Sequence, residues 1–255
     1  MKAIILSAGQ GSRLLPLTAD RPKCSLPIAG QPLLAWQLQQ AALAGIDEAV
    51  VVTGFHCEQV EQIVAATPAP RVRTLFNPFY AVSDNLGTCW IARAEMAQPF
   101  VLINGDTLFE AAILARLLDA DPALPITLVS DRKSAYDEDD MKIIAEGRQL
   151  RRVSKRLDHA NVNGESIGMI RFQSEGAARF REKIEAMMQS GEGLKRWYLS
   201  AIDELAQAGG VAICPIEGLS WCEVDDRDDL VQAEAVVSQW PRALSRTAQS
   251  KTLSG

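Results

Sequence analysis

The chain has 255 residues, of which 47% are hydrophobic and 23% charged, as in an ordinary globular protein with a sizeable core. Its formal net charge of −6 argues against nucleic-acid binding, which requires a basic face. The five cysteines show neither a CxxC pair nor a zinc spacing, and no run approaches the length of a membrane span. Met1 is followed at once by a strand-like run rather than a signal-peptide pattern, so we expect a cytoplasmic protein without membrane insertion.

Apolar runs and helical periodicities alternate over the first half of the chain. The pattern predicts strands at residues 3–6, 48–53, 72–76, 100–104 and 126–130, and helices at residues 32–43, 58–66, 85–96 and 111–119. Such alternation at short spacing indicates βαβ units, and therefore a parallel sheet with helices on both faces.

The pattern changes after residue 130. A hairpin is predicted at residues 141–145 and 149–156, strands at 166–172, 211–215 and 220–224, and helices at 177–188, 199–208 and 226–239. Neither an internal repeat nor a linker divides the chain, so we expect a single domain over residues 1–240. The polar tail over residues 241–255 is expected to be disordered.

Positive charge in the first quarter of the chain gathers in the loop after the first strand. This loop holds Gly9, Gly11, Arg13, Arg21 and Lys23, and the next Lys or Arg is Arg71. A glycine-bearing loop with local positive charge, in an acidic protein, suits a polyanion such as a nucleoside triphosphate.

Three phosphate-binding loops are worth comparing. A Walker loop requires a G-x-x-x-x-G-K-[ST] spacing that is absent here. A dinucleotide loop requires a third glycine, where Leu14 stands, and an acid after the second strand, which ends in Thr53. The remaining pattern is G-x-G-x-R followed by Pro-Lys. In it Arg13 can fork onto two phosphate oxygens and Lys23 supplies a compact charge. The alternative is a tight turn with two surface bases.

Triphosphate chemistry also requires carboxylates for a divalent ion. Asp106 follows the buried strand at residues 100–104 and so lies at the carboxyl edge of the sheet, where open α/β sheets bind ligands. A strand over residues 221–225 would place Trp221, Glu223 and Asp225 on one face. The alternative for both acids is helix capping.

The run LSAGQGSRLLPLT…RPKCSLPIAGQPLL resembles the signature of the sugar-phosphate nucleotidyltransferases, and the likeness continues in order to about Leu230. The resemblance implies a Rossmann-like three-layer α/β fold, with a mostly parallel mixed sheet and a small α+β acceptor-binding insertion. The nucleotide-binding part would cover about residues 1–130 and the acceptor-binding part about 131–220. By the same likeness Arg13 and Lys23 hold the triphosphate, Asp106 and Asp225 hold Mg²⁺, and base and ribose contact the backbone of Leu6, Ala8, Gly9, Gln10 and Gly11.

The segment FNPFYAVSDNLGTCWIA resembles the branch that makes CDP-choline or CDP-aminoethylphosphonate. That branch has two Asn where this chain has Asp84-Asn85, and Ser-Leu where it has Thr88-Cys89. The likeness places Ser83, Asp84 and Asn85 at the nucleotide and implies CTP as the donor.

The acceptor site is predicted from a few scattered residues. Glu165, in Glu165-Ser166-Ile167-Gly168, resembles a motif that lines the acceptor pocket in relatives. Tyr198, and Trp221 with Glu223, would form an aromatic and acidic cage for an ammonium, and Lys142 would meet the acceptor's phosphate. The alternatives are core packing and ordinary surface charge.

These predictions imply in-line attack of an acceptor oxygen on the α-phosphorus, with release of pyrophosphate. A phosphate is already largely ionised near neutral pH, so no general base is required. Three other functions stay open: a sugar-1-phosphate or polyol-phosphate nucleotidyltransferase, a non-catalytic nucleotide-binding regulator and a nicotinamide-dependent oxidoreductase. The chain by itself leaves the formation of a homo-oligomer open.

Overall fold

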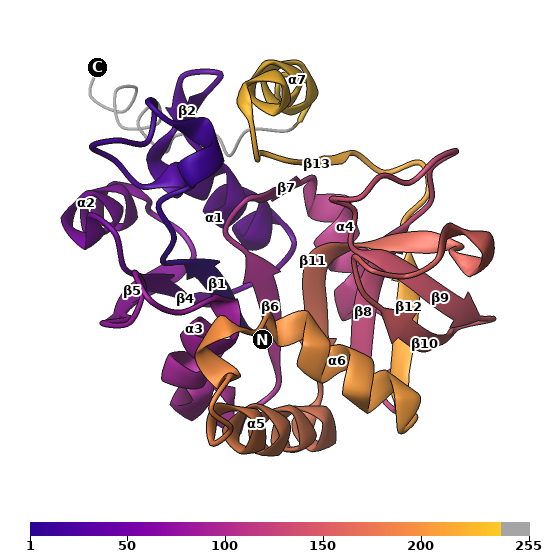
Figure 1. Ribbon diagram of the computed structural model, residues 1–255. Coiled ribbons are helices and arrows are strands. Elements are labelled where there is room, and N and C mark those ends of the chain that lie inside the picture. Colours follow the sequence, from indigo (N-terminus) through magenta and orange to yellow (C-terminus); the bar gives the residue numbers. More distant parts are fainter. Residues whose placement is uncertain (241–255) are drawn as a thin grey trace, which may run out of the picture.

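The computed structural model describes residues 1–240, so the predicted disordered tail over residues 241–255 lies outside the described residues. A nine-stranded sheet runs through the molecule in the order β5-β4-β1-β6-β11-β8-β12-β10-β9 (Figure 1). Its strands are β1 (Lys2–Ser7), β4 (Glu48–Thr53), β5 (Arg71–Phe76), β6 (Phe100–Asn104), β8 (Ile126–Asp131), β9 (Lys142–Glu146), β10 (Gln149–Val153), β11 (Gly164–Phe172) and β12 (Val211–Pro215). Two small pairs lie beside it: β2 (Pro27–Ile28) with β3 (Gln31–Pro32), and β7 (Thr107–Phe109) with β13 (Trp221–Glu223).

Helices cover both faces of this sheet. They are α1 (Leu33–Leu43), α2 (Cys57–Ala66), α3 (Asn85–Ile91), α4 (Ala111–Leu118), α5 (Ser174–Met188) and α6 (Tyr198–Gln207), while α7 (Arg227–Val237) packs on β13 and β2. Helices α3, α5 and α6 pack on one face through a core that includes Phe100, Phe172 and Phe180 (Figure 1). Helices α1, α2 and α4 pack on the other face. Within residues 1–240 no helix is long and apolar enough to cross a membrane.

The first half of the sheet is parallel. Strands β5, β4, β1 and β6 all run in one direction, and β1 and β4 are buried almost throughout, as expected for strands covered on both faces. Their carboxyl ends therefore meet at one edge, where the loops after Ser7 and Asn104 begin. Strand β11 runs antiparallel to β6 and β8, which makes the sheet mixed.

The second half of the sheet turns back on itself. Strand β9 pairs with β10 and also with the first two residues of β11, so that β11, β8, β12, β10 and β9 form a closed circuit of pairings. Lys142 lies opposite Glu165 in this circuit. The hairpin predicted from the sequence is therefore joined to the main sheet at two places.

The predicted fold class is confirmed, and the differences are local. The helix predicted over residues 85–96 ends at Ile91, and a 3-10 turn over Ala92–Ala97 carries its buried side chains onward. Strands β2, β3 and β7 were not predicted, because strands of two or three residues are too short to show an alternating pattern. The division of the chain into a single domain with two functional parts stays a prediction.

Candidate active site

The loop after β1 is shaped by glycine and internal hydrogen bonds. Gly11 has φ +79°, and a Cβ at this position would stand 2.8 Å from Cβ of Lys23. Both the left-handed backbone and the close approach therefore require glycine. The Thr18 hydroxyl donates to the carbonyl of Gly11 at 2.8 Å, and the Gln10 amide donates to the carbonyl of Thr18 at 3.0 Å. The aliphatic part of the Lys23 side chain therefore packs directly against the turn at Gly11.

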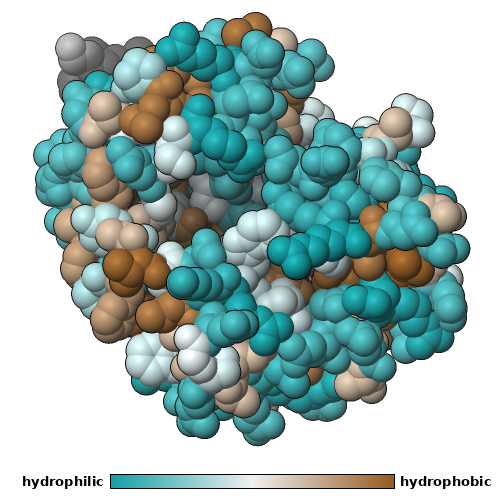
Figure 2. All heavy atoms as spheres, in the orientation of Figure 1, coloured by the Kyte–Doolittle hydropathy of each residue, from teal (hydrophilic) through white to brown (hydrophobic). Residues whose placement is uncertain are grey.

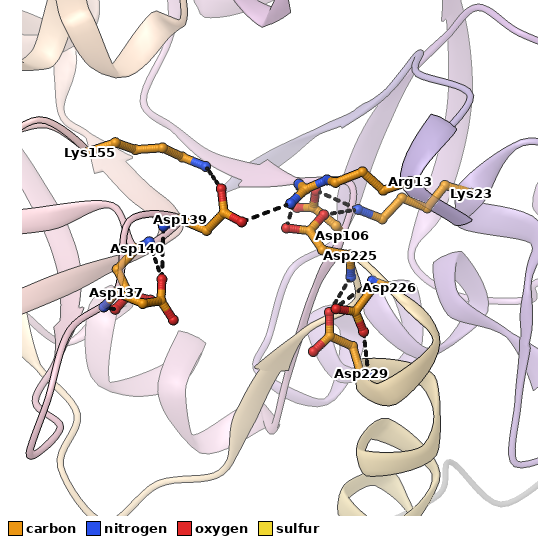
Figure 3. A network of polar contacts seen from close by, with 10 residues as sticks. All are labelled: Arg13, Lys23, Asp106, Asp137, Asp139, Asp140, Lys155, Asp225, Asp226 and Asp229. Atoms are coloured by element: carbon orange, nitrogen blue, oxygen red, sulfur yellow. Dashed lines mark hydrogen bonds and ion pairs between the residues drawn. The ribbon is translucent and has the colours of Figure 1, made fainter. Parts of the chain in front are cut away.

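Lys23 stands between two carboxylates that lie far apart in the sequence. Its Nζ donates to Oδ2 of Asp106 at 3.0 Å and to Oδ1 of Asp225 at 2.6 Å (Figure 3). Arg13 contacts the other oxygen of Asp225, with Nη2 at 2.8 Å from Oδ2. The two predicted cations and the two predicted metal ligands form one network.

The pairing of β7 with β13 brings Asp225 to Asp106. Glu223 lies opposite Thr107 in this antiparallel pair, and the Val224 amide donates to the Asp106 carbonyl at 3.1 Å. Asp226 then caps α7 through a capping box with Asp229. Asp106 does not cap the next helix, because the N-cap of α4 is Glu110. The capping alternative therefore applies to Asp226 and Asp229, and leaves Asp106 and Asp225 free to face Lys23.

The charges in this network perturb one another. Burial lowers the pKa of Lys23, but the carboxylates of Asp106 and Asp225 outweigh burial and raise it above its usual value. Burial raises the pKa of Asp225, but Lys23 and Arg13 outweigh that effect and hold it below its usual value. Burial, helped by Asp106 and Asp225, raises the pKa of Glu223 to about 8. The site thus holds a charged Lys23 and Asp225 beside a Glu223 that is largely protonated at neutral pH.

Two connected cavities open at the carboxyl edge of the parallel strands. The first, here called the loop cavity, has a volume of about 280 Å³ and is lined by Leu6, Ser7, Gly9, Gly11, Ser12, Arg13, Lys23, Gly105, Asp106 and Asp225. The second, the α3 cavity, has a volume of about 250 Å³ and is lined by Leu6, Ala8, Gly9, Tyr80, Ser83, Asp84, Asn85, Thr88, Asn104, Gly105, Asp106 and Trp197. They share Leu6, Gly9, Gly105 and Asp106, so a molecule of two parts can span both. Figure 2 shows a hollow near the middle of this view, bordered largely by hydrophilic side chains.

The α3 cavity contains most residues predicted to contact the nucleotide. The amino end of α3 is clamped from the far part of the chain: the Asp84 amide donates to the Leu194 carbonyl at 2.7 Å, and the Tyr198 amide donates to Oδ1 of Asn85 at 2.8 Å. Gln10 lines neither cavity and bonds within its own loop. The structure therefore brings Ser83, Asp84 and Asn85 to the cavity but leaves Gln10 outside it.

The site has a place for a divalent cation. Oδ1 of Asp106 is buried and has no hydrogen-bond partner, while its Oδ2 and Asp225 already hold the ammonium of Lys23. Within residues 1–240 no group of three or more His, Cys, Asp or Glu side chains is placed to hold a metal ion. Mg²⁺ commonly binds through one or two carboxylates together with substrate phosphates, so this pair fits Mg²⁺ bound together with a triphosphate.

Two of the predicted acceptor residues are buried in the closed circuit of strands. Lys142 is 1% exposed and donates to the backbone carbonyl of Asp137. Glu165 lies 3.2 Å from Nζ of Lys133, which also contacts Asp140 at 2.5 Å. Burial raises the pKa of Glu165 to about 7, with Lys133 opposing the rise and Asp140 adding to it. Neither Lys142 nor Glu165 lines the loop cavity or the α3 cavity.

The aromatic residues of the predicted cage use their polar atoms for internal hydrogen bonds. Tyr198 is fully buried, and its hydroxyl donates to Oδ1 of Asn104 at 2.9 Å, so it supports the end of β6. Trp221 turns its indole N–H to Asp131 at 2.7 Å and packs on the core. Glu223 is close enough to Asp106, Asp225 and Tyr198 for its charge to act on all three. Their roles in acceptor binding stay predictions.

The loop between β8 and β9, whose residues Tyr136 and Asp137–Asp140 were a further candidate for the ammonium cage, instead reaches the loop cavity through Asp139. Oδ2 of Asp139 lies 3.6 Å from Arg13, and Oδ1 lies 3.3 Å from Nζ of Lys155 (Figure 3). This carboxylate links the loop cavity to the region after β10. An acidic run such as Asp137–Asp140 is usually solvated, and its sequence gives no signal of this contact.

A family model places the chain among known proteins. The model described as "MobA-like NTP transferase domain" matches residues 3–205, which contain β1, the glycine loop, Lys23 and Asp106. The chain belongs to this family. The resemblance to nucleotidyltransferases is thereby confirmed.

Curated relatives agree with this membership. The chain is 30% identical over 98% of its length to the CMP-5'-(3-aminopropyl)phosphonate synthase of Streptomyces rubellomurinus, and spans 41% of that protein. It is 32% identical over 43% of its length to the choline-phosphate cytidylyltransferase of Streptococcus pneumoniae, and spans 47% of it. The chain thus spans less than half the length of these two relatives. A third, the CTP:phosphoglutamine cytidylyltransferase of Campylobacter jejuni, is matched over its full length at 23% identity, with 92% of this chain covered.

Solved structures share the fold. The CTP:phosphocholine cytidylyltransferase of Streptococcus pneumoniae matches with a TM-score of 0.75 at 21% identity, over 92% of this chain and 98% of that one. The inositol-1-phosphate CTP transferase of T. maritima matches with a TM-score of 0.78 at 17% identity, over 94% of this chain and 97% of that one.

Proposed function

We propose that this protein transfers CMP from CTP to a small acceptor that carries a phosphate or phosphonate, such as phosphocholine or 2-aminoethylphosphonate, and releases pyrophosphate. The proposal depends above all on Lys23, whose ammonium bridges Asp106 and Asp225 at the point where the loop cavity and the α3 cavity meet. Support for cytidine as the base comes from relatives whose names state CMP or cytidylyl transfer.

The two cavities divide the nucleotide between them. The α3 cavity, with Ser83 and Asn85 at its wall, takes the nucleoside, and the loop cavity takes the triphosphate on Arg13, Lys23 and the glycine backbone. The α-phosphorus then lies near Gly105 and Asp106, which both cavities share. A Cβ at Gly105 would stand 2.3 Å from the Leu6 carbonyl, so this part of the site requires glycine.

Asp106 and Asp225 would hold Mg²⁺, which supplies charge neutralisation to the triphosphate when bound. The chain's own cations act on the same charge. Lys23 leaves its two carboxylates for phosphate oxygens, and Arg13 changes partner from Asp225 to phosphate. The attacking oxygen is already ionised, so the protein has only to position it in line with the leaving pyrophosphate.

The test is pyrophosphate release with each of the four nucleoside triphosphates and Mg²⁺. The acceptors are phosphocholine, 2-aminoethylphosphonate, a sugar 1-phosphate and a polyol phosphate. We expect CTP with an amine-bearing phosphate or phosphonate to give the highest rate. Release with a sugar or polyol phosphate alone would establish the alternative acceptor class. Absence of release with every pair would exclude the enzymatic function.

A further inference from the structure

A fully buried glutamine of α1 reaches the turn that carries Asp106. Gln37 is 0% exposed, and its Nε2 donates to the backbone carbonyls of Asn104 and Thr107, each at 2.8 Å. These carbonyls stand at the end of β6 and the start of β7, on either side of Gly105 and Asp106. One side-chain amide therefore holds both ends of the turn.

Other distant segments hold the rest of this turn. The Val224 amide donates to the carbonyl of Asp106 at 3.1 Å, and the Thr107 hydroxyl donates to the carbonyl of Ile167 at 2.9 Å. The backbone around Asp106 is thus attached to α1, to β11 and to the residue after β13. The position of its carboxylate relative to Lys23 depends on these bonds.

Helix α1 also contacts the segment that carries Lys23. It packs on the 3-10 turn Lys23–Ser25 as well as on β7. The same helix therefore supports Lys23 through packing and Asp106 through the amide of Gln37. It fixes the ammonium and one of its two carboxylates relative to each other.

The amide of Gln37 is not explained by packing alone. Its Oε1 is buried and has no hydrogen-bond partner among the described residues, which lowers stability. Leu34, Leu38 and Ala41 of the same helix fill the core with apolar side chains. Because both partners of Gln37 are carbonyl oxygens, only its nitrogen can face them. The cost of the unsatisfied oxygen is thus offset by the two bonds to the turn.

We propose that Gln37 is a positioning residue for the proposed transfer reaction. It acts through Asp106, because holding both ends of the turn keeps the unpartnered Oδ1 in place for a divalent cation and Oδ2 in place beside Lys23. Gln37 itself lines neither the loop cavity nor the α3 cavity. The inference rests on the proposed function and adds to it a residue that does not touch the substrates.

A matched control lies on the same helix. Gln40 is also fully buried, and its Oε1 accepts the amide of Ala111 at 2.9 Å, at the start of α4. Gln37→Met and Gln40→Met each replace a buried amide by an apolar side chain of similar length, so urea unfolding should show a loss of stability in both. Only the first substitution affects the turn that carries Asp106.

Mn²⁺ is the probe of the metal site. Its binding to the full chain is measured by electron paramagnetic resonance in the presence of α,β-methylene-CTP, and pyrophosphate release with CTP and Mg²⁺ is measured in parallel. We expect Gln37→Met to weaken Mn²⁺ binding and to lower kcat, each about 10–100-fold. Gln40→Met should bind Mn²⁺ as the wild type does. Equal losses in the two variants, or wild-type Mn²⁺ binding by a folded Gln37→Met, would overturn the inference.

A second pair of variants serves where Gln37→Met does not fold. A neutral carboxyl group has one donor hydrogen where the amide has two, so in Gln37→Glu one of the two carbonyls loses its bond. Gln40→Glu keeps an oxygen for the Ala111 amide. Weaker Mn²⁺ binding in Gln37→Glu alone supports the inference, and equal binding in the two variants contradicts it.

The two proposals fail in different ways. Pyrophosphate release by the wild type, together with equal losses in both Met variants, supports CMP transfer and excludes the positioning role. Mn²⁺ binding that weakens in Gln37→Met alone, without pyrophosphate release by the wild type from any pair of substrates, supports the positioning role and contradicts CMP transfer. A wild type that binds no Mn²⁺ would exclude the positioning role.

Discussion

The loop cavity is built differently from the cavity of about 810 Å³ between the segment after β10 and α6, here called the hairpin cavity. In the loop cavity Lys23, Asp106 and Asp225 form one connected network, held by a glycine turn and by the ends of β1 and β6. In the hairpin cavity Arg156 and Lys195 project from loops without partners among the described residues. In the loop cavity the charged side chains are held in place by one another and by the strand ends that carry them. In the hairpin cavity the two unpaired charged side chains are exposed.

This difference predicts how well each cavity tolerates substitution of its charged residues. A tightly packed, mutually paired group of charges tolerates little change, because every member is the partner of another. Exposed, unpaired cations can be exchanged at small cost in stability. We therefore expect substitutions in the loop cavity to abolish turnover, and substitutions of Arg156 or Lys195 in the hairpin cavity to be tolerated better.

The largest expected effect follows from Lys23→Ala. Removal of the ammonium that bridges both carboxylates and contacts phosphate should lower pyrophosphate release about 10²–10³-fold. The control Lys2→Ala removes a lysine at the opposite end of β1, where its Nζ pairs with Glu95 at 2.9 Å, and should leave the rate nearly normal. Steady-state rates and circular dichroism check both variants. A folded Lys23→Ala variant with near-normal rate would contradict the assignment.

Asp106→Asn is expected to act through the metal. The amide keeps the shape of the side chain but loses the charge on its unpartnered oxygen, so the rate should fall about 10²-fold. The Mg²⁺ concentration for half-maximal rate should rise. Asp119→Asn, at the exposed end of α4, is the control. An unchanged Mg²⁺ titration in Asp106→Asn would show that another group binds the metal.

Glu165→Gln should alter the pH dependence of stability. The pKa of Glu165 lies near 7 in the folded protein against 4.5 ordinarily, so between these values the folded state holds a proton that the unfolded state has lost. The contribution of Glu165 to the free energy of unfolding of the wild type is thus highest below pH 4.5, and it decreases as the pH rises to about 7. The advantage of the Gln variant should grow over that window, by up to about 3 kcal/mol.

Urea unfolding at several pH values measures this difference. Glu146→Gln, an exposed substitution on β9, should show no such trend. A Glu165→Gln difference that is constant from pH 5 to pH 8 would mean that Glu165 is ionised throughout.

Asp139→Asn should have the smallest effect. Its carboxylate lies 3.6 Å from Arg13, and both side chains are largely exposed, so the pair contributes about 0–1 kcal/mol. Removal leaves Asp225 as the acid paired with Arg13 among the described residues and should lower the KM for the triphosphate up to about fivefold, with kcat unchanged. Asp20→Asn, which changes a carboxylate of similar exposure on the first loop, is the control. An equal KM in Asp139→Asn and wild type would show that the contact does not compete with the substrate.

The grouping of residues in the loop cavity could be predicted because these residues stand in short, ordered motifs. Gly9, Gly11 and Arg13 follow directly after a buried strand, and Asp106 follows another. The carboxyl ends of parallel strands meet at one edge, so the order of elements alone brings these residues together. The side-chain amide of Gln10 bonds to the Thr18 carbonyl within the loop, and the predicted contact of its backbone with the nucleotide stays a prediction.

The surroundings of the residues predicted to bind the acceptor were harder to predict. Tyr198 and Trp221 were predicted from residue type, yet both use their polar atoms for internal hydrogen bonds, to Asn104 and Asp131. Lys142 is buried because β9 closes the circuit of strands onto β11, a pairing that no local pattern signals. Arg156 and Lys195 stand in no motif of the sequence, and only the structure shows that both line one cavity.

The sequence by itself determined the fold class, the glycine turn and the types of charge that surround the glycine loop. Those features depend on short-range chemistry: apolar runs, glycine conformation and the order of strands. Only the tertiary structure decided that β7 pairs with β13 and so places Asp225 against Asp106 and Lys23. It also decided which exposed bases face a common cavity, because that depends on contacts between segments more than a hundred residues apart, such as Asp84 with Leu194.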